Sequence, residues 1–118
     1  MSIGYGWEQL HKAVYSMSAS QRSLQDRLEA ATAGALIHAK ADEDIPPELR
    51  EEFKSVIQAL TCVEAQGGEG TIAATCATMD DQTAIDLIHR IVGLYDEITR
   101  IDAVRDGQLS RGAAKRRR

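Results

Sequence analysis

The fold class follows from residues 46–60, PPELREEFKSVIQAL. Its apolar side chains recur every three or four positions, the spacing that places them on one face of an α-helix. A proline in the first helical turn loses no needed hydrogen bond, and the glutamates that follow favour the positive end of a helix. We therefore expect a helix that begins near Pro46 or Pro47 and packs against the last helix of the chain. Its buried face comprises Leu49, Phe53, Val56, Ile57 and Leu60.

A longer helix is predicted before this stretch, over about residues 21–40. Ser18 or Ser20 is expected to cap it, because serine oxygen accepts hydrogen bonds from the free N–H groups of a first turn. Its middle, residues 30–35, consists of small side chains, and Gly34 is expected to let another helix approach closely. The buried face comprises Leu24, Leu28, Ala31, Ala35 and Leu36.

Two shorter helices complete the first 80 residues. One is expected over about residues 7–18, where apolar side chains again lie three or four apart. The other follows the glycine-rich loop 64–70, is capped by Thr71 and covers residues 72–76. The apolar face of the first comprises Trp7, Leu10, Val14 and Met17.

The last helix is predicted to be the longest, over about residues 81–104, with Asp80 as its cap and Gly107 beyond its end. Its apolar stripe is wider than one partner helix can cover, so we expect it to be central or to contact another molecule. Its polar face is expected to hold the i,i+4 pairs Asp86–Arg90 and Asp96–Arg100. The apolar stripe comprises Ile85, Leu87, Ile88, Ile91, Val92, Leu94, Tyr95, Ile98 and Ile101.

No stretch alternates polar and apolar residues long enough to make a sheet. The 118 residues therefore predict an all-α helical bundle of four main helices and one short helix, in a single domain over residues 1–104. This domain carries eight basic and 17 acidic side chains, a net charge of −9. Residues 105–118 carry six basic side chains and one acidic, and we expect them to form a basic, flexible tail.

Charge and cysteine content bear on location and partners. The acidic domain opposes nucleic acid, so binding of nucleic acid is expected only as a weak, salt-sensitive contact of the tail. The first residues lack the basic and apolar regions of a signal peptide, and no apolar run reaches the roughly 18 residues of a membrane span. Two cysteines without a paired CxxC motif indicate neither a disulfide framework nor a zinc ribbon. We expect a cytoplasmic protein with reduced thiols.

His11, His38 and His89 are the candidate metal ligands, one on each of three predicted helices. No HxxxH or HExxH spacing supports a site. Helical di-iron proteins need a Glu-x-x-His motif on two helices, and Glu8 with His11 supplies it only once unless a dimer duplicates it. We therefore expect no catalytic residue and no cofactor, with a site of His11 and Glu8 with His38 or His89 as the alternative.

Three other clusters are interpreted as structural. Cys62 and Cys76 are expected to be small buried side chains, and a redox pair requires their Cα atoms within about 7 Å. The loop that contains Glu69 lacks the lysine of a phosphate-binding loop, and the carboxylate would repel phosphate. Residues 42–44, Asp-Glu-Asp, lack the spacing of a calcium loop and are expected to form a solvated turn.

Two stretches of the sequence are similar to those of a known group of proteins. One runs from Leu36-Ile37-His38 to Ile45-Pro46-Pro47-Glu48-Leu49, and the other is Glu69-Gly70-Thr71-Ile72-Ala73-Ala74-Thr75 followed by Met79-Asp80-Asp81. They resemble a group of small, uncharacterised bacterial helical proteins of about this length. The resemblance covers most of residues 7–100 and includes no catalytic motif. It implies a bacterial cytoplasmic origin and no known activity.

The function we expect is a non-enzymatic helical module for protein–protein interaction. A homodimer would cover the wide stripe of the last helix, through Trp7, Tyr95 or neighbouring isoleucines. The alternatives are the small metal-binding or enzymatic bundle described above and a nucleic-acid-associated accessory protein that acts through its tail. The basic residues that end this tail are Arg116, Arg117 and Arg118.

Overall fold

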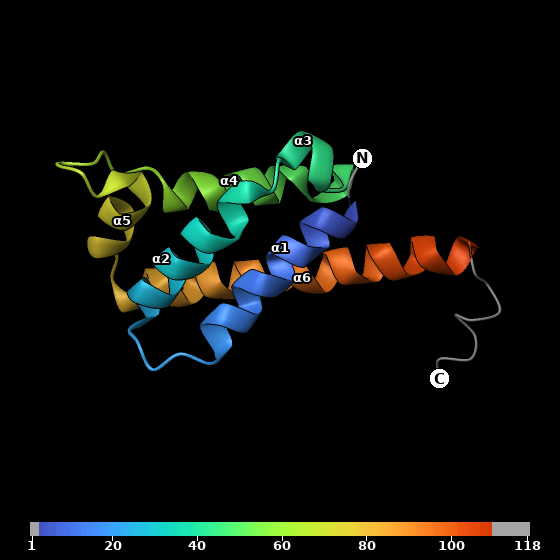
Figure 1. Ribbon diagram of the computed structural model, residues 1–118, viewed down its shortest axis with the longest axis horizontal. Coiled ribbons are helices and arrows are strands. Elements are labelled where there is room, and N and C mark those ends of the chain that lie inside the picture. Colours follow the sequence, from blue (N-terminus) through green and yellow to red (C-terminus); the bar gives the residue numbers. More distant parts are fainter. Residues whose placement is uncertain (1–2, 110–118) are drawn as a thin grey trace.

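The computed structural model describes the backbone of residues 3–109 and the side chains of residues 3–104. Within this range all regular secondary structure is helical, which confirms the all-α class (Figure 1). The four main helices and the short helix before the last one are present, and a further helical turn and two 3₁₀ turns lie between them. The elements are α1 (Ile3–Ser18), α2 (Leu24–Gly34), η1 (Leu36–His38), α3 (Ala41–Asp44), η2 (Pro47–Leu49), α4 (Arg50–Leu60), α5 (Gly70–Ala77) and α6 (Asp81–Leu109).

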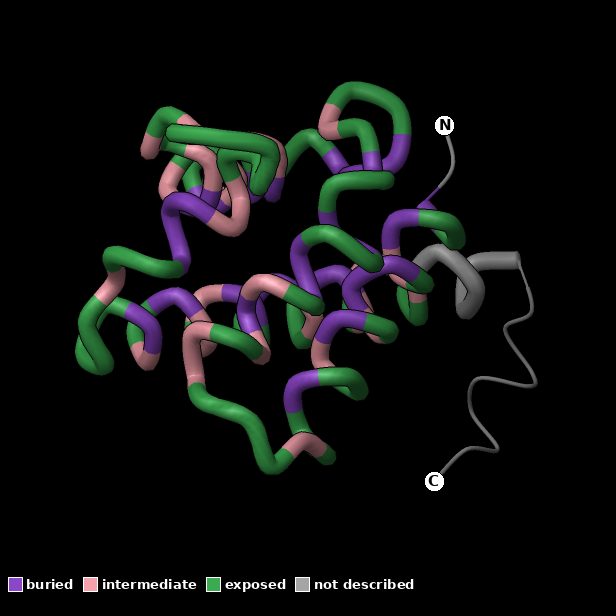
Figure 2. The backbone as a smooth tube through the Cα atoms, turned by 60° about the vertical axis from the view of Figure 1, so that its left-hand side comes forward, coloured by how far each residue is buried: buried purple, intermediate pink, exposed green. Residues whose placement is uncertain are grey.

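Helix α6 runs along the whole molecule, and α1, α2 and α4 all contact it (Figure 1). It buries one side chain every three or four residues, namely Leu87, Ile91, Leu94 and Ile98. These side chains belong to one hydrophobic core together with residues of α1, α2 and α4. Figure 2 shows buried positions along each of these helices, with exposed positions between them. The width of its apolar stripe predicted that this helix is central or contacts another molecule. The structure shows that α6 is central.

Helix α4 supplies the opposite side of this core. Leu49, Phe53, Val56 and Leu60 are buried, as their spacing predicted. Ile57 is only half-buried, because it lies at the edge of the apolar face and lines a surface pocket. Four positions of the predicted face are thus confirmed, and the fifth is a boundary position.

Helix α1 begins at Ile3, four residues earlier than expected, and its extra turn carries a close contact with α3. A Cβ atom at Gly6 would overlap the backbone carbonyl of Asp44, so only glycine fits there. The Asp44 side chain is buried and accepts a hydrogen bond of 2.8 Å from the backbone N–H of Lys40. The prediction of a fully solvated acidic turn is therefore wrong at Asp44, although Asp42 and Glu43 are exposed.

Helix α2 is shorter at both ends than predicted. Ser23 caps it, with its hydroxyl accepting a hydrogen bond of 3.0 Å from the backbone N–H of Asp26, so Ser18 and Ser20 do not. The helix ends at Gly34, and the chain continues as the 3₁₀ turn η1. No atom lies within 4 Å of a Cβ built on Gly34, so the predicted close helix approach at this residue is wrong.

The last two helices begin close to the expected positions. Helix α5 begins at Gly70, which has a φ of 85°. The predicted cap at Thr71 is wrong, because Thr71 lies inside the helix and Glu69 occupies the cap position. Asp80 caps α6 as predicted, accepting a hydrogen bond of 2.8 Å from the backbone N–H of Thr83. The predicted helix end at Gly107 is wrong, because α6 continues through this residue to Leu109. A glycine inside a helix costs only about 1 kcal/mol relative to alanine, which a long helix tolerates.

Candidate functional site

The two aromatic residues predicted to make interactions, Trp7 and Tyr95, lie together where α1 contacts α6. Their ring centroids are 6.0 Å apart. The indole nitrogen of Trp7 donates a hydrogen bond of 2.8 Å to the hydroxyl of Thr99, which in turn donates one of 2.7 Å to the carbonyl of Tyr95. Both rings are half-buried by this contact. Their participation in pairing between copies remains a prediction.

His11 belongs to the same aromatic cluster. Its ring stacks on Trp7 with centroids 4.9 Å apart and an interplanar angle of 11°. Its Nδ1 lies 3.1 Å from the hydroxyl of Tyr95, and the ring of Tyr15 also stacks on it, with centroids 5.9 Å apart. The hydrogen bond with Tyr95 therefore joins α1 to α6, whereas both stacking contacts lie within α1.

The other candidate metal ligands do not join it. His38 is exposed in η1, His89 is exposed on α6, and Glu8 is exposed on α1. Among the described residues no group of three or more His, Cys, Asp or Glu side chains is placed to hold a metal ion. Within the described residues of one copy, the histidines and Glu8 therefore do not form a group of the kind that holds a metal ion.

The outer face of α6 points away from the core, and its side chains are exposed within the described residues. Val92 and Val104 on this face are 41% and 59% exposed. An open groove of about 530 Å³ follows part of the face, lined by residues that include His89, Val92 and Gly93. We define the outer face as His89, Val92, Gly93, Asp96, Arg100, Ala103 and Val104.

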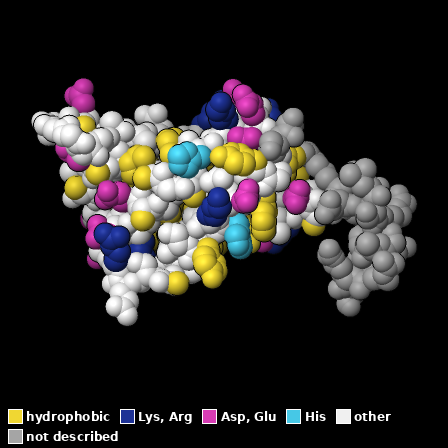
Figure 3. Space-filling model, in the orientation of Figure 1, with side chains coloured by type: hydrophobic (Ala, Val, Ile, Leu, Met, Phe, Trp, Pro, Cys, Tyr) yellow, Lys and Arg dark blue, Asp and Glu magenta, His cyan; other side chains and the backbone are white. Residues whose placement is uncertain are grey.

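The charges near this face are arranged in pairs. Asp96 and Arg100 form the predicted ion pair at 2.9 Å, and both side chains remain exposed. The predicted pair of Asp86 with Arg90 is wrong, because Arg90 instead binds Glu52 of α4 through both carboxylate oxygens. These hydrogen bonds hold the pKa of Glu52 below its ordinary value. In Figure 3, which shows one face of the molecule, hydrophobic side chains are likewise interspersed with charges of both signs.

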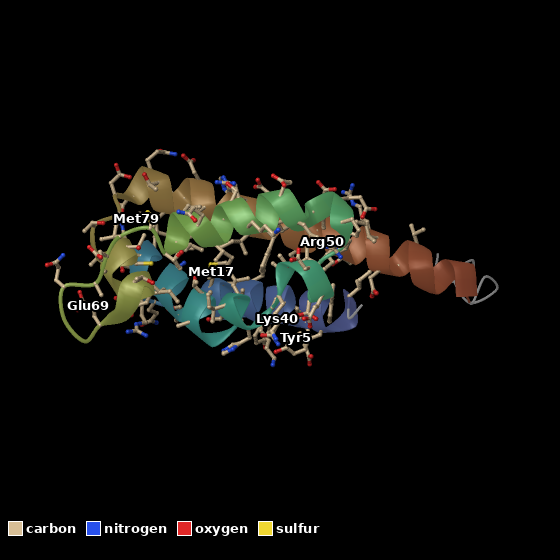
Figure 4. The ribbon with its side chains drawn as sticks, turned by 90° about the horizontal axis from the view of Figure 1, so that it is seen from above. Tyr5, Met17, Lys40, Arg50, Glu69 and Met79 are labelled. Atoms are coloured by element: carbon tan, nitrogen blue, oxygen red, sulfur yellow. The ribbon has the colours of Figure 1, made fainter. Side chains whose placement is uncertain are left out.

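The C-terminal part of α6 extends beyond the other helices. It passes the ends of α1 and α4 both in the first view and when seen from above (Figure 1, Figure 4). Ile101 and Asp102 are half-buried, whereas Ala103 and Val104 are exposed. The outer face therefore continues onto a length of helix that has little cover from its own chain.

The surroundings of the two cysteines and of the glycine-rich loop fit a structural role. Cys76 is buried, and desolvation, followed by the charges of Glu29 and Asp26, raises its pKa to about 11. Cys62 is exposed, so the expectation of a buried side chain is wrong for this cysteine. Neither thiol forms a disulfide within the described chain. Glu69 lies in the glycine-rich loop at one end of the molecule (Figure 4). Its carboxylate accepts a hydrogen bond of 3.2 Å from the backbone N–H of Gln66. Because a carboxylate uses a backbone N–H of this loop, the loop does not offer that donor to phosphate.

The remaining sequence candidates, Arg116, Arg117 and Arg118, lie outside the described residues. None of the helices inside that range is both long and apolar enough to cross a membrane. Sequence analysis identified Asp96 and Arg100 as an ion pair but did not group them with His89, Gly93 and Ala103 into one surface, although these residues recur at helical spacing. The reason is that these residues are small or polar, whereas apolar spacing is the usual signal.

Comparisons with protein-family models, with curated proteins and with solved structures found no family, protein or structure that matches this chain.

Proposed function

We propose that this protein is a non-enzymatic interaction module that pairs with a second copy of itself through the outer face of α6. The observation that carries the proposal is the exposure of Val92 and Val104 on a helix whose opposite side is buried from Ala84 to Ile98. Leaving two large aliphatic side chains in water is unfavourable by about 25 cal/mol per Å² of apolar surface. Association that covers them offsets this cost in both copies.

The chemistry of the described residues favours interaction over catalysis. The one cluster of titratable and aromatic side chains, around His11, is occupied by its own internal contacts with Trp7 and Tyr95. Trp7 and Tyr95 border the outer face and hold α1 against α6, so they support the paired surface from one side. The module therefore acts through its shape and surface.

Sedimentation over about 1 to 100 μM tests the proposal. We expect the unmodified chain to be dimeric at tens of micromolar. Val92→Asp and Val104→Asp should each weaken the association at least tenfold, because a charge would be buried in the contact. A chain that remains monomeric at tens of micromolar overturns the proposal.

Ile37→Asp is the matched control. Ile37 is 42% exposed, almost the same as Val92, but it lies in η1 and lines a separate pocket of about 220 Å³ beside Phe53. Its substitution should leave the association unchanged. An equal loss of association in Ile37→Asp and Val92→Asp would show that the outer face is not the contact. Metal analysis of protein purified without chelator accompanies the test, since a stoichiometric metal would favour the alternative of a metal-binding bundle.

We also propose the cytoplasm of a bacterium as the location. The resemblance described above supports a bacterial origin. An exposed, unbridged Cys62 fits a reducing compartment, where thiols persist.

A further inference from the structure

The outer face of α6 contains a seam with the spacing of a two-helix coiled coil. Its members lie alternately four and three residues apart, the repeat that keeps one edge of a helix facing a partner helix. They are small or charged, so size and charge decide how a second helix can lie on them. The seam comprises His89, Gly93, Asp96, Arg100 and Ala103.

The charges of Asp96 and Arg100 favour one relative orientation of the two copies of α6. Asp96 and Arg100 lie two residues before and two residues after Ile98, and both are well exposed, at 57% and 75% of their side chains. If two copies of α6 run antiparallel with Ile98 at the level of the two-fold axis, Asp96 of each copy lies beside Arg100 of the other. If the copies run parallel and in register, Asp96 faces Asp96 and Arg100 faces Arg100, which is repulsive.

The sizes of the side chains favour the same level for the two-fold axis. Gly93 and Ala103 lie five residues on either side of Ile98, and Val92 and Val104 lie six residues on either side. In the antiparallel arrangement, Val104 of one copy packs over Gly93 of the other, and Val92 packs beside Ala103. A Cβ atom at Gly93 would meet nothing within 4 Å, so the space for a partner's side chain is open. Each exposed valine thus meets a small residue, the complementarity that knobs-into-holes packing needs.

We propose that two copies of this protein pair through α6 in an antiparallel two-fold arrangement centred at Ile98, with reciprocal Asp96–Arg100 ion pairs. This inference rests on the proposed function and specifies its partner and geometry. The contact from Val92 to Val104 covers about 18 Å of helix. Because its central layers are ionic and exposed at their edges, the association should weaken as the salt concentration rises.

Cysteine cross-linking tests the arrangement. Two single variants, Gly93→Cys and Ala103→Cys, are made in a Cys62→Ser background, and oxidised separately and as a mixture. The antiparallel arrangement predicts a cross-linked dimer that forms rapidly only in the mixture. Rapid cross-linking of Gly93→Cys with itself, or of Ala103→Cys with itself, overturns the antiparallel register.

Charge reversal provides a second, independent readout by sedimentation. Asp96→Arg and Arg100→Asp should each weaken the dimer at least tenfold, because each places like charges in contact. The double variant should recover most of the affinity, since the reciprocal pairs are restored with opposite polarity. Single variants that dimerise as tightly as the unmodified chain overturn the inference.

The two proposals fail in different ways. A dimer with the wrong cross-linking pattern overturns the antiparallel register and leaves pairing through the outer face intact. An unmodified chain that is monomeric at tens of micromolar overturns both. Asp96 and Arg100 are exposed and outside the core. At concentrations low enough for every chain to be monomeric, the thermal unfolding of each variant, followed by circular dichroism, is therefore expected to stay close to that of the unmodified chain.

Discussion

Arg90 and Glu52 join α6 to α4 through two parallel hydrogen bonds, 2.7 Å from Arg90 Nε and 2.9 Å from Nη2. Nη2 also donates a hydrogen bond of 2.8 Å to the hydroxyl of Ser55. The planar guanidinium matches the carboxylate in this two-point geometry, which lysine does not provide. The pair therefore links the two helices at the edge of the core.

Replacement of Glu52 by glutamine should make stability less dependent on pH. The hydrogen bonds from Arg90 hold the pKa of the folded Glu52 below its ordinary value of 4.5. The ionised pair therefore stabilises the protein above this value, and the contribution is lost as pH falls through the lower pKa of the folded state. Because both side chains are substantially exposed, at 36% and 44%, we expect a difference below about 1 kcal/mol at pH 7.

Urea unfolding of Glu52→Gln at pH 7 and at successively lower pH checks this expectation. The difference from the unmodified chain should shrink as pH falls below 4.5. Glu51→Gln is the matched control, because Glu51 is the adjacent residue and is exposed. Equal stabilities of the two variants at pH 7 would show that the pair with Arg90 contributes nothing.

Truncation of Phe53 should be among the most destabilising changes in α4. Its side chain is 3% exposed and belongs to the core that α6 completes. Phe53→Ala should lower the free energy of unfolding by about 3–5 kcal/mol, through lost transfer energy and the cavity that remains. Ile57→Ala, at the half-buried edge of the same helix, should cost clearly less. A loss below about 1 kcal/mol for Phe53→Ala in denaturant unfolding would contradict the burial of this face.

The periodic parts of the fold could be predicted from sequence, because helical spacing is a local property. Leu49, Phe53, Val56 and Leu60 repeat at the helical period, so their shared face followed without knowledge of any partner. The ends of α2 were less predictable. Several serines near its beginning offer the same capping hydroxyl, and tertiary packing selects Ser23.

Contacts between distant residues could not be predicted in the same way. Asp86 and Glu52 are equally suitable partners for Arg90 by charge, and only the packing of α4 on α6 brings Glu52 within reach. The hydrogen bond from Trp7 to Thr99 joins residues 92 positions apart. The contact of Gly6 with α3 likewise depends on how α3 packs back against α1. The spacing of residues within one helix does not determine this packing.

Substitution of Gly6 by alanine should weaken the contact of α1 with α3. The new Cβ would overlap the carbonyl of Asp44, so one of the two backbones must move. Gly4→Ala is the control in the same helix, since nothing lies within 4 Å of that position, and alanine should stabilise the helix by up to about 1 kcal/mol. The two variants should therefore change the thermal midpoint in opposite directions. Stabilisation by Gly6→Ala would show that α1 and α3 are not in close contact.

Replacement of Thr32 by valine should stabilise the protein. The Thr32 hydroxyl is fully buried in α2 and has no hydrogen-bond partner among the described residues. A buried, unsatisfied polar group costs about 1–3 kcal/mol, and valine keeps nearly the same shape without this group. We therefore expect Thr32→Val to raise the free energy of unfolding by about 1 kcal/mol in urea unfolding.

Thr75→Val provides the comparison for this last prediction. Thr75 is also buried, but its hydroxyl donates a hydrogen bond of 2.7 Å to the carbonyl of Thr71 and accepts one of 2.9 Å from the backbone N–H of Val63. Valine there would leave the N–H of the half-buried Val63 without its acceptor, so stability should fall by about 1–3 kcal/mol. The same substitution thus has opposite signs at two buried threonines of neighbouring helices. Destabilisation by Thr32→Val as large as that by Thr75→Val would mean that the Thr32 hydroxyl is hydrogen-bonded in solution.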